Sequence, residues 1–157
     1  MIEIKATKKE HALYVAKHLR ESDKREMMRA GQQDCHAAVL ESVRVSPFAF
    51  TALKDGVPMA LFGVKPDSVL SPRARVWLLG TDEINFTKKE FVKNCRIVLD
   101  GLLDIYPVLY NAVDASYTQA VRLLQFLGAQ FGKTVKSPTG APFLIFEIRR
   151  ENNVYRK

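Results

Sequence analysis

The stretch SYTQAVRLLQFLGAQF, residues 116–131, does most to decide the fold. Its apolar residues recur at steps of three and four, which predicts a short helix with one buried face. The residues of that face are Ala120, Leu123, Leu124 and Leu127. Gly128 follows, and the residues after it begin a predicted strand. We therefore expect a helix that turns directly into a strand near the end of the chain.

Further elements are predicted on both sides of this stretch. Apolar periodicity and turn residues predict the order strand, two helices, three strands, helix, strand, helix and two strands. The second helix spans residues 23–45 with a break near Gly31, and Asp55-Gly56 is a favoured hairpin pair. A meander followed by strands separated by helices predicts an α/β fold, with a mixed sheet and helices on both faces. We expect a single domain over residues 1–150 and a polar tail over residues 151–157.

Three short segments have the form of a capping box, in which a hydroxyl and a Glu or Gln side chain satisfy the first backbone N–H groups of a helix. They are Thr7–Glu10, Thr87–Glu90 and Ser116–Gln119. Each predicts that a helix begins at its hydroxyl residue.

The chain is strongly basic, since its 157 residues carry a net charge of +7 and its pI is near 9.5. This favours an anionic partner, namely nucleic acid, a phosphorylated cofactor, an acidic protein or an anionic membrane surface, and it equally suits a solvated basic surface. Basic residues gather where the first helix ends and the second begins. No aromatic residue is interleaved there and no nucleic-acid-reading motif is visible, so a solvated face is the favoured interpretation. These residues are Lys17, Arg20, Lys24, Arg25 and Arg29.

Other sequence features concern compartment and metal binding. The opening residues MIEIKATKKEH contain no apolar core and predict no signal peptide, and no apolar run reaches the length of a membrane span. Cys35 and Cys95 lie far apart and are expected to be free core thiols. His11 and His18 lack a third ligand, so we expect no metal site. These features together predict an intracellular compartment.

The order of elements, with residues 116–131 near its end, resembles the GNAT superfamily of acyl-coenzyme A N-acyltransferases. Members often carry Asn-x-x-Ala-x-x-x-Tyr-x-x-x-Gly-Phe in the last helix, and Ala120 and Gly128 match it. Tyr117 stands at the Asn position, Leu124 at the Tyr position and Ala129 at the Phe position. The Tyr often serves as general acid toward the leaving thiolate, and Leu124 has no ionisable proton for that role. The stretch is therefore better evidence for the fold than for catalysis.

The second place of resemblance is the strand ending WLLGT and the turn GTDEINFTKKE that follows it. Family members hold the cofactor diphosphate here on a glycine-rich loop and a helix N-terminus. This chain has Gly80 but no glycine pair, and Asp82 and Glu83 stand where phosphates would approach. The resemblance implies a pantetheine arm on backbone groups, a diphosphate on lysines and two further contacts from the last helix. The implied cofactor-binding residues are Leu78, Leu79, Gly80, Lys88, Lys89, Tyr117 and Arg122.

The implied cofactor is acetyl-CoA or another acyl-CoA, with no metal, and the acceptor would be an amine. Water or Glu41 would take the amine proton, although a solvated glutamate is the commoner case. Asp114 and Ser116 fall at the end of a strand where the family binds its cofactor, and Ser116 is also explained as a helix N-cap. Trp77 is expected in the core or in the wall of a substrate pocket.

A narrower resemblance, over about residues 48–148, is to small GNAT-like proteins of short-tailed phages. Some of these are described as internal virion or ejection-associated proteins, and they commonly lack the glycine loop. Three functions therefore stay open: an acyltransferase, a non-enzymatic virion or assembly component, and a regulator that binds a host protein or nucleic acid through its basic face. The implied location is the host cytoplasm or the virion.

Overall fold

The computed structural model describes residues 1–150, so the predicted tail at 151–157 lies outside the described residues. Within the described residues, seven strands form one sheet in the order β1-β2-β3-β4-β5-β7-β6. Only β4 and β5 pair in parallel among these neighbours. The strands are β1 (Ile2–Ala6), β2 (Phe48–Lys54), β3 (Val57–Pro66), β4 (Arg73–Gly80), β5 (Val108–Asp114), β6 (Gln130–Lys136) and β7 (Pro142–Arg149).

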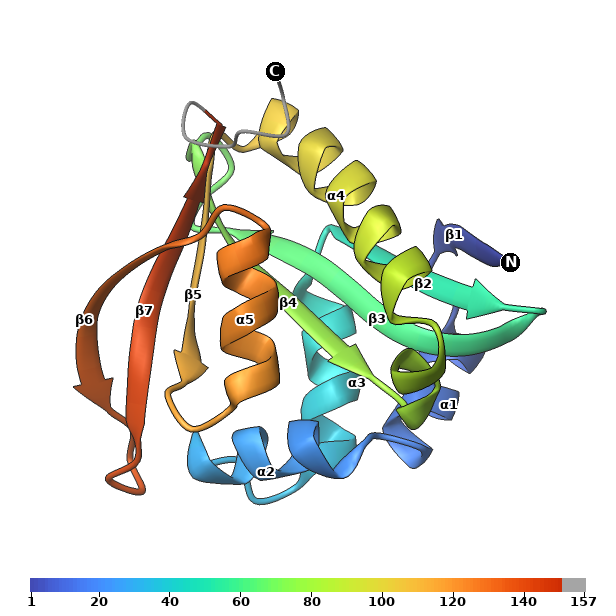
Figure 1. The fold of residues 1–157 in the computed structure, drawn as a ribbon, viewed down its shortest axis with the longest axis horizontal. Helices are drawn as coiled ribbons and strands as arrows, with labels where there is room; N and C mark the ends of the chain where they lie inside the picture. The colour runs from blue at the N-terminus through green and yellow to red at the C-terminus, as the bar shows by residue number, and fades with distance from the viewer. Residues whose placement is uncertain (151–157) are drawn as a thin grey trace.

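Helices cover both faces of the sheet, as the sequence predicted. They are α1 (Lys9–Lys17), α2 (Glu21–Arg29), α3 (Cys35–Val45), α4 (Lys88–Ile105) and α5 (Thr118–Phe126), with a short 3-10 helix η1 (Asp82–Phe86) before α4. In Figure 1, α4 and α5 lie in front of the sheet and α1 and α3 lie behind it. Helix α2 runs along the lower edge, where β4 and β5 end. None of the described helices is long and apolar enough to cross a membrane.

Two predicted turns are confirmed by the backbone. Gly31 has a φ of 101°, and it separates α2 from α3 where a break was expected. Asp55 and Gly56 have φ values of 51° and 82°, and they join β2 to β3. Positive φ at both central residues is the requirement of a type I′ hairpin turn, which explains the choice of Asp-Gly.

Two predicted capping boxes are wrong. Lys8, and not Thr7, is the N-cap of α1, and the Thr7 hydroxyl instead lies 2.9 Å from the Thr51 hydroxyl on β2. Thr87 is the N-cap of α4, but its hydroxyl donates to the Glu83 carbonyl oxygen at 3.3 Å. In both cases a partner from a neighbouring element outcompetes the first turn of the helix.

The core is divided by the sheet into an α4–α5 side and an α1–α3 side. On the first side, Leu103 of α4 packs in one buried cluster with Leu109 of β5 and Phe146 of β7. On the second, Val15 of α1 and Val39 of α3 cluster with apolar residues of β3 and β4. The two faces of β4 therefore pack against different helices.

Candidate functional site

The two parallel strands β4 and β5 separate soon after they begin. Their pairing covers only Arg73–Arg75 against Val108–Tyr110. Asn111 then lies between the strands, because its Nδ2 donates to the Val76 carbonyl oxygen at 2.8 Å and its Oδ1 accepts from Arg75 at 3.0 Å. Figure 1 shows the strands diverging from here toward α2.

A cavity of about 1350 Å³ occupies the space that this divergence opens. Its lining comes from α4 and α5 on one side of the sheet, from α3 on the other, and from β4, β5 and α2 between them. The volume exceeds the range of about 300–1,000 Å³ that is usual for small-molecule sites. The cavity therefore reaches from one face of the sheet to the other and has room for an extended ligand.

Helix α2 lies across the end of this opening and is held there by the side chain of Asp23, a residue that is only 2% exposed. Asp23 Oδ2 accepts from the Gly80 N–H at 2.8 Å and from Arg20 Nε at 2.9 Å. Asp23 Oδ1 accepts from the Tyr117 hydroxyl at 2.8 Å. The Arg20 N–H in turn donates to the Gly80 carbonyl oxygen at 2.9 Å. One buried carboxylate thus joins α2, the end of β4 and the start of α5.

A second set of contacts fastens α2 to the end of β5. Glu26 Oε2 accepts from the Asp114 N–H at 3.0 Å, and Arg29 Nε donates to Asp114 Oδ2 at 2.5 Å. Asp114 Oδ1 accepts from both the N–H and the hydroxyl of Ser116, at 2.9 and 2.8 Å. Burial would raise the pKa of Asp114, but the hydrogen bonds from Ser116 and Arg29 outweigh it and hold the pKa below its ordinary value. The predicted role of Ser116 as helix N-cap is wrong, since Tyr117 is the N-cap of α5 and Ser116 donates both of its hydrogen bonds to Asp114.

Glu26 is the carboxyl group with the largest change in acidity at this site. Burial, together with the charges of Asp23 and Asp114, raises the pKa of Glu26 to about 7, against the opposing effects of Arg20 and the Asp114 N–H. Glu26 was not predicted from the sequence, because its segment DKREMMRAG has the composition of a basic helix exposed to solvent. Nothing in that segment shows that α2 crosses the ends of β4 and β5.

The three residues predicted to hold a pantetheine arm lie at the end of β4, but their backbone N–H and C=O groups point in different directions. The backbone of Leu79 faces β3, where it pairs with Leu61. Gly80 uses both its N–H and its carbonyl oxygen on α2. Leu78 lies two residues from both Val76 and Gly80, and backbone groups alternate along a strand, so the N–H and C=O of Leu78 face the opening between the strands. Leu78 and Leu79 both line the cavity.

The α4–α5 side of the cavity carries the predicted cationic residues. Lys88 and Lys89 line it from the first turn of α4, and Arg122 lines it from α5. Lys93 and Arg96 add two further cations to the lining, and the Arg96 guanidinium lies 3.9 Å from the centre of the Phe126 ring. An anion that enters between α4 and α5 would therefore meet several positive charges.

Tyr117 and Leu124 complete this part of the lining. The Tyr117 hydroxyl is engaged with Asp23 and with Ser22 Oγ, and burial raises its pKa above that of an ordinary tyrosine. Leu124 packs against the core on the same side. Neither side chain is suited to donate a proton at neutral pH.

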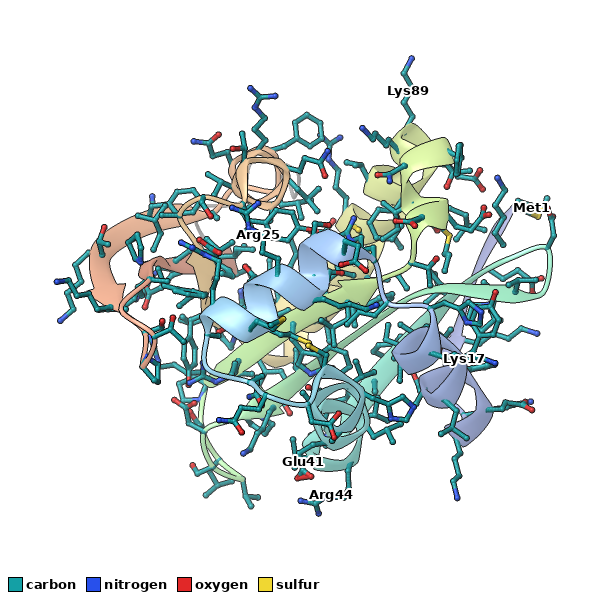
Figure 2. All side chains as sticks on the ribbon, turned by 90° about the horizontal axis from the view of Figure 1, so that it is seen from below. Met1, Lys17, Arg25, Glu41, Arg44 and Lys89 are labelled. Carbon is teal, nitrogen blue, oxygen red and sulfur yellow. The ribbon has the colours of Figure 1, made fainter. Side chains whose placement is uncertain are left out.

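The α3 side of the cavity is lined by Glu41, Ser42 and Trp77. Glu41 forms an ion pair with Arg44 on the outer surface, where Figure 2 shows both side chains pointing away from the sheet. The hydrogen bond from Arg44 lowers the pKa of Glu41, which makes it a weaker base. The Trp77 Nε1–H donates to Ser46 Oγ at 2.8 Å.

The remaining candidates from the sequence are the basic face, the possible metal ligands and the two cysteines. The predicted basic face is split, because Arg20 and Arg29 point inward to Asp23 and Asp114 while Lys24 pairs with Glu21 on the surface. Within residues 1–150 no group of three or more His, Cys, Asp or Glu is placed to hold a metal ion. Cys35 and Cys95 are free.

Comparison with known proteins supports the fold rather than a sequence family. A scan against protein families gave no match, and neither did a search of curated protein sequences. Solved structures do match. An aminoglycoside N(6′)acetyltransferase from Legionella pneumophila has a TM-score of 0.74 at 11% identity, with 99% of this chain and 96% of that chain covered.

Two further acetyltransferases give the same result. Aminoglycoside acetyltransferase AAC(6′)-Ib in complex with coenzyme A has a TM-score of 0.69 at 17% identity, over 97% of this chain and 96% of that chain. Ribosomal-protein-S5-alanine acetyltransferase from Vibrio fischeri has a TM-score of 0.66 at 12% identity, over 96% and 94%. The chain therefore has, over nearly its whole length, the single-domain α/β fold of the GNAT acetyltransferases.

Proposed function

We propose that the chain is an acyl-CoA-dependent N-acyltransferase. The observation that carries the proposal is the separation of β4 from β5 into a cavity that reaches both faces of the sheet. Structures with the same fold hold coenzyme A or acetyl-CoA, which supports a ligand of this class. An extended thioester on one face and an amine on the other would meet between the two strands.

The cofactor would lie along the α4–α5 side of the cavity. The N–H and C=O groups of Leu78 would bind the amides of the pantetheine arm as a neighbouring strand does. Lys88, Lys89 and the first turn of α4 would receive the diphosphate, with Arg122 opposite them. The predicted contact of the arm with the backbone of Gly80 would require displacement of Asp23, so Leu78 carries most of this role.

Calorimetric titration with acetyl-CoA tests the proposal. Wild-type protein should bind, and Lys89→Glu should bind at least about tenfold more weakly, since one attractive charge becomes repulsive. Lys17→Glu on α1 is the matched control, because it changes the net charge equally but lies far from α4, as Figure 2 shows. No binding of wild-type protein at millimolar cofactor, or equal loss in both variants, would contradict the proposal.

A second function is favoured by the contacts that close the end of the cavity. Gly80 is engaged by α2, and Leu124 stands at the position where the family pattern places Tyr. Both suit a protein that keeps the fold without the reaction, such as an internal virion protein of the phage type or a regulator of a host protein. Mass spectrometry of purified particles checks the virion role, and absence of acetyl-CoA binding combined with presence in particles would support it.

A further inference from the structure

The cavity holds several groups that exchange protons, and most of them are committed to other partners. Asp23 already accepts three hydrogen bonds, from Gly80, Arg20 and Tyr117. Asp34 accepts from the Ala37 N–H as the N-cap of α3. The Cys95 thiol is held neutral, because burial raises its pKa to about 12.

Glu26 differs from these groups in its geometry. One carboxyl oxygen, Oε2, is fixed by the Asp114 N–H at the end of β5, so the group is held at the opening between β4 and β5. The side chain lines the cavity and is only partly buried. A carboxylate fixed through one oxygen can still accept a proton at the other.

We propose that Glu26 is the catalytic base of this chain, and that the acceptor amine reaches the thioester beside α2. The inference rests on the proposed acyltransferase function. The amine lone pair forms the C–N bond to the thioester carbonyl carbon, and the proton on nitrogen passes to the Glu26 carboxylate. The C–S bond breaks with its electron pair left on sulfur. The thiolate then takes up the proton, which yields an amide and free coenzyme A thiol.

The surroundings of Glu26 suit this role at neutral pH. Asp23 and Asp114 face it from α2 and β5 and oppose its ionisation, whereas Arg20 favours it. The hydrogen bonds that Ser116 and Arg29 donate to Asp114 keep that neighbouring carboxylate ionised. A base is most effective when its pKa lies near the working pH, because it is then both deprotonated and strong enough to accept a proton.

The decisive experiment compares Glu26→Gln with Glu21→Gln, which makes the same chemical change on the exposed side of the same helix. Thiol release from acetyl-CoA is followed with ribostamycin, spermidine and a lysine-containing peptide as probe amines, and acetyl-CoA binding is measured by calorimetry. Glu26→Gln should lower kcat/KM by about 10²–10⁴-fold with cofactor affinity unchanged within about twofold. Glu21→Gln should change neither.

Two further measurements distinguish a catalytic base from a residue with a structural role alone. In wild-type protein kcat/KM should rise with pH through about 7, and this rise should vanish in Glu26→Gln. Carbon-13 NMR of labelled glutamate carboxyls, with the Glu26 signal identified by its absence in the variant, should show titration near 7 without any acceptor. Titration near the ordinary value of 4.5 would overturn the inference.

Other outcomes are equally decisive. Full activity in Glu26→Gln would overturn the inference and leave the proposed function intact. Failure of wild-type protein to bind acetyl-CoA, or to transfer to any probe amine, would overturn the proposed function, and the role of Glu26 with it.

Discussion

At the scale of single residues, Asp23 organises the end of the cavity. Its carboxylate joins a backbone N–H of β4, a guanidinium of α2 and a hydroxyl of α5. A buried carboxylate is tolerated only when such partners replace water. Removing it would leave the Arg20 charge and the Gly80 N–H without their acceptor.

Asp23→Ala should therefore lower the free energy of unfolding by about 3–5 kcal/mol, the usual cost of breaking a buried ion pair. Urea denaturation followed by circular dichroism measures this. Glu21→Ala removes an exposed partner of Lys24 and should cost less than about 1 kcal/mol. Equal losses in the two variants would contradict the assigned role of Asp23.

Glu26 makes a prediction about stability and pH. Its pKa is raised from 4.5 to about 7 in the folded protein, so folding favours the protonated form. Its contribution to stability is then fully present below about 4.5 and is lost as the pH rises through about 7. Relative to Glu26→Gln, which stays neutral, wild-type protein should lose stability between pH 5 and pH 8. Urea unfolding of both proteins at four pH values across this range checks it, and a constant difference would count against the raised pKa.

Sequence reasoning succeeded less well with individual hydroxyl groups. It assigned Thr7, Thr87 and Ser116 to helix caps, and of these three only Thr87 occupies an N-cap position. Each of the three hydroxyl groups bonds a group outside the helix that follows it. Capping patterns describe what a residue can do locally. They cannot show that Thr51 or Asp114 lies within 3 Å in the folded chain.

At the scale of elements, most of the structure could be predicted. Period-two and period-3.6 patterns located the helices and strands, and Gly31 marked the break between α2 and α3. The placement of α2 across the ends of β4 and β5 could not be predicted, because it depends on contacts between residues 57 to 94 positions apart. That placement is what makes Glu26 a candidate for chemistry.

Two glycines, one inside a helix and one in a turn, should respond in opposite ways to substitution by alanine. Gly101 lies inside α4 with nothing within 4 Å of an added Cβ, so Gly101→Ala should stabilise the protein by about 0.5–1 kcal/mol. Gly56 also has open space, but its φ is 82°, so Gly56→Ala should destabilise by about 1–2 kcal/mol. Thermal and urea unfolding of both variants measure this. Because neither site is crowded, changes of the same sign would contradict the assignment of backbone conformation as the cause.

At the scale of the whole molecule, the sequence supported a fold and left the activity open. The element order and residues 116–131 pointed to the GNAT fold, and the match to solved acetyltransferases confirms it. The cofactor residues stay predictions, since a fold hosts many functions and the glycine loop that would mark the diphosphate site is absent from GTDEINFTKKE.

The cationic residues that line the cavity make a prediction about ionic strength. Cations gather on the α4–α5 side of the cavity, so acetyl-CoA affinity should fall by about tenfold between roughly 50 and 500 mM NaCl as screening shortens the range of their attraction. The dependence of log Kd on log salt concentration should be shallower in Lys89→Glu and unchanged in Lys17→Glu. If the slope is the same in all three proteins, the salt dependence of acetyl-CoA affinity comes from overall charge and not from the cations on the α4–α5 side of the cavity.

Trp77 gives the molecule an optical property of practical use. It is the only tryptophan in the chain, it lines the cavity, and its indole N–H is held by Ser46. Its emission spectrum therefore reports a single environment. A molecule that fills the cavity should displace water from the ring and shift the emission to shorter wavelength, whereas unfolding should shift it to longer wavelength. The same chromophore can thus follow both occupancy and denaturation without an added label.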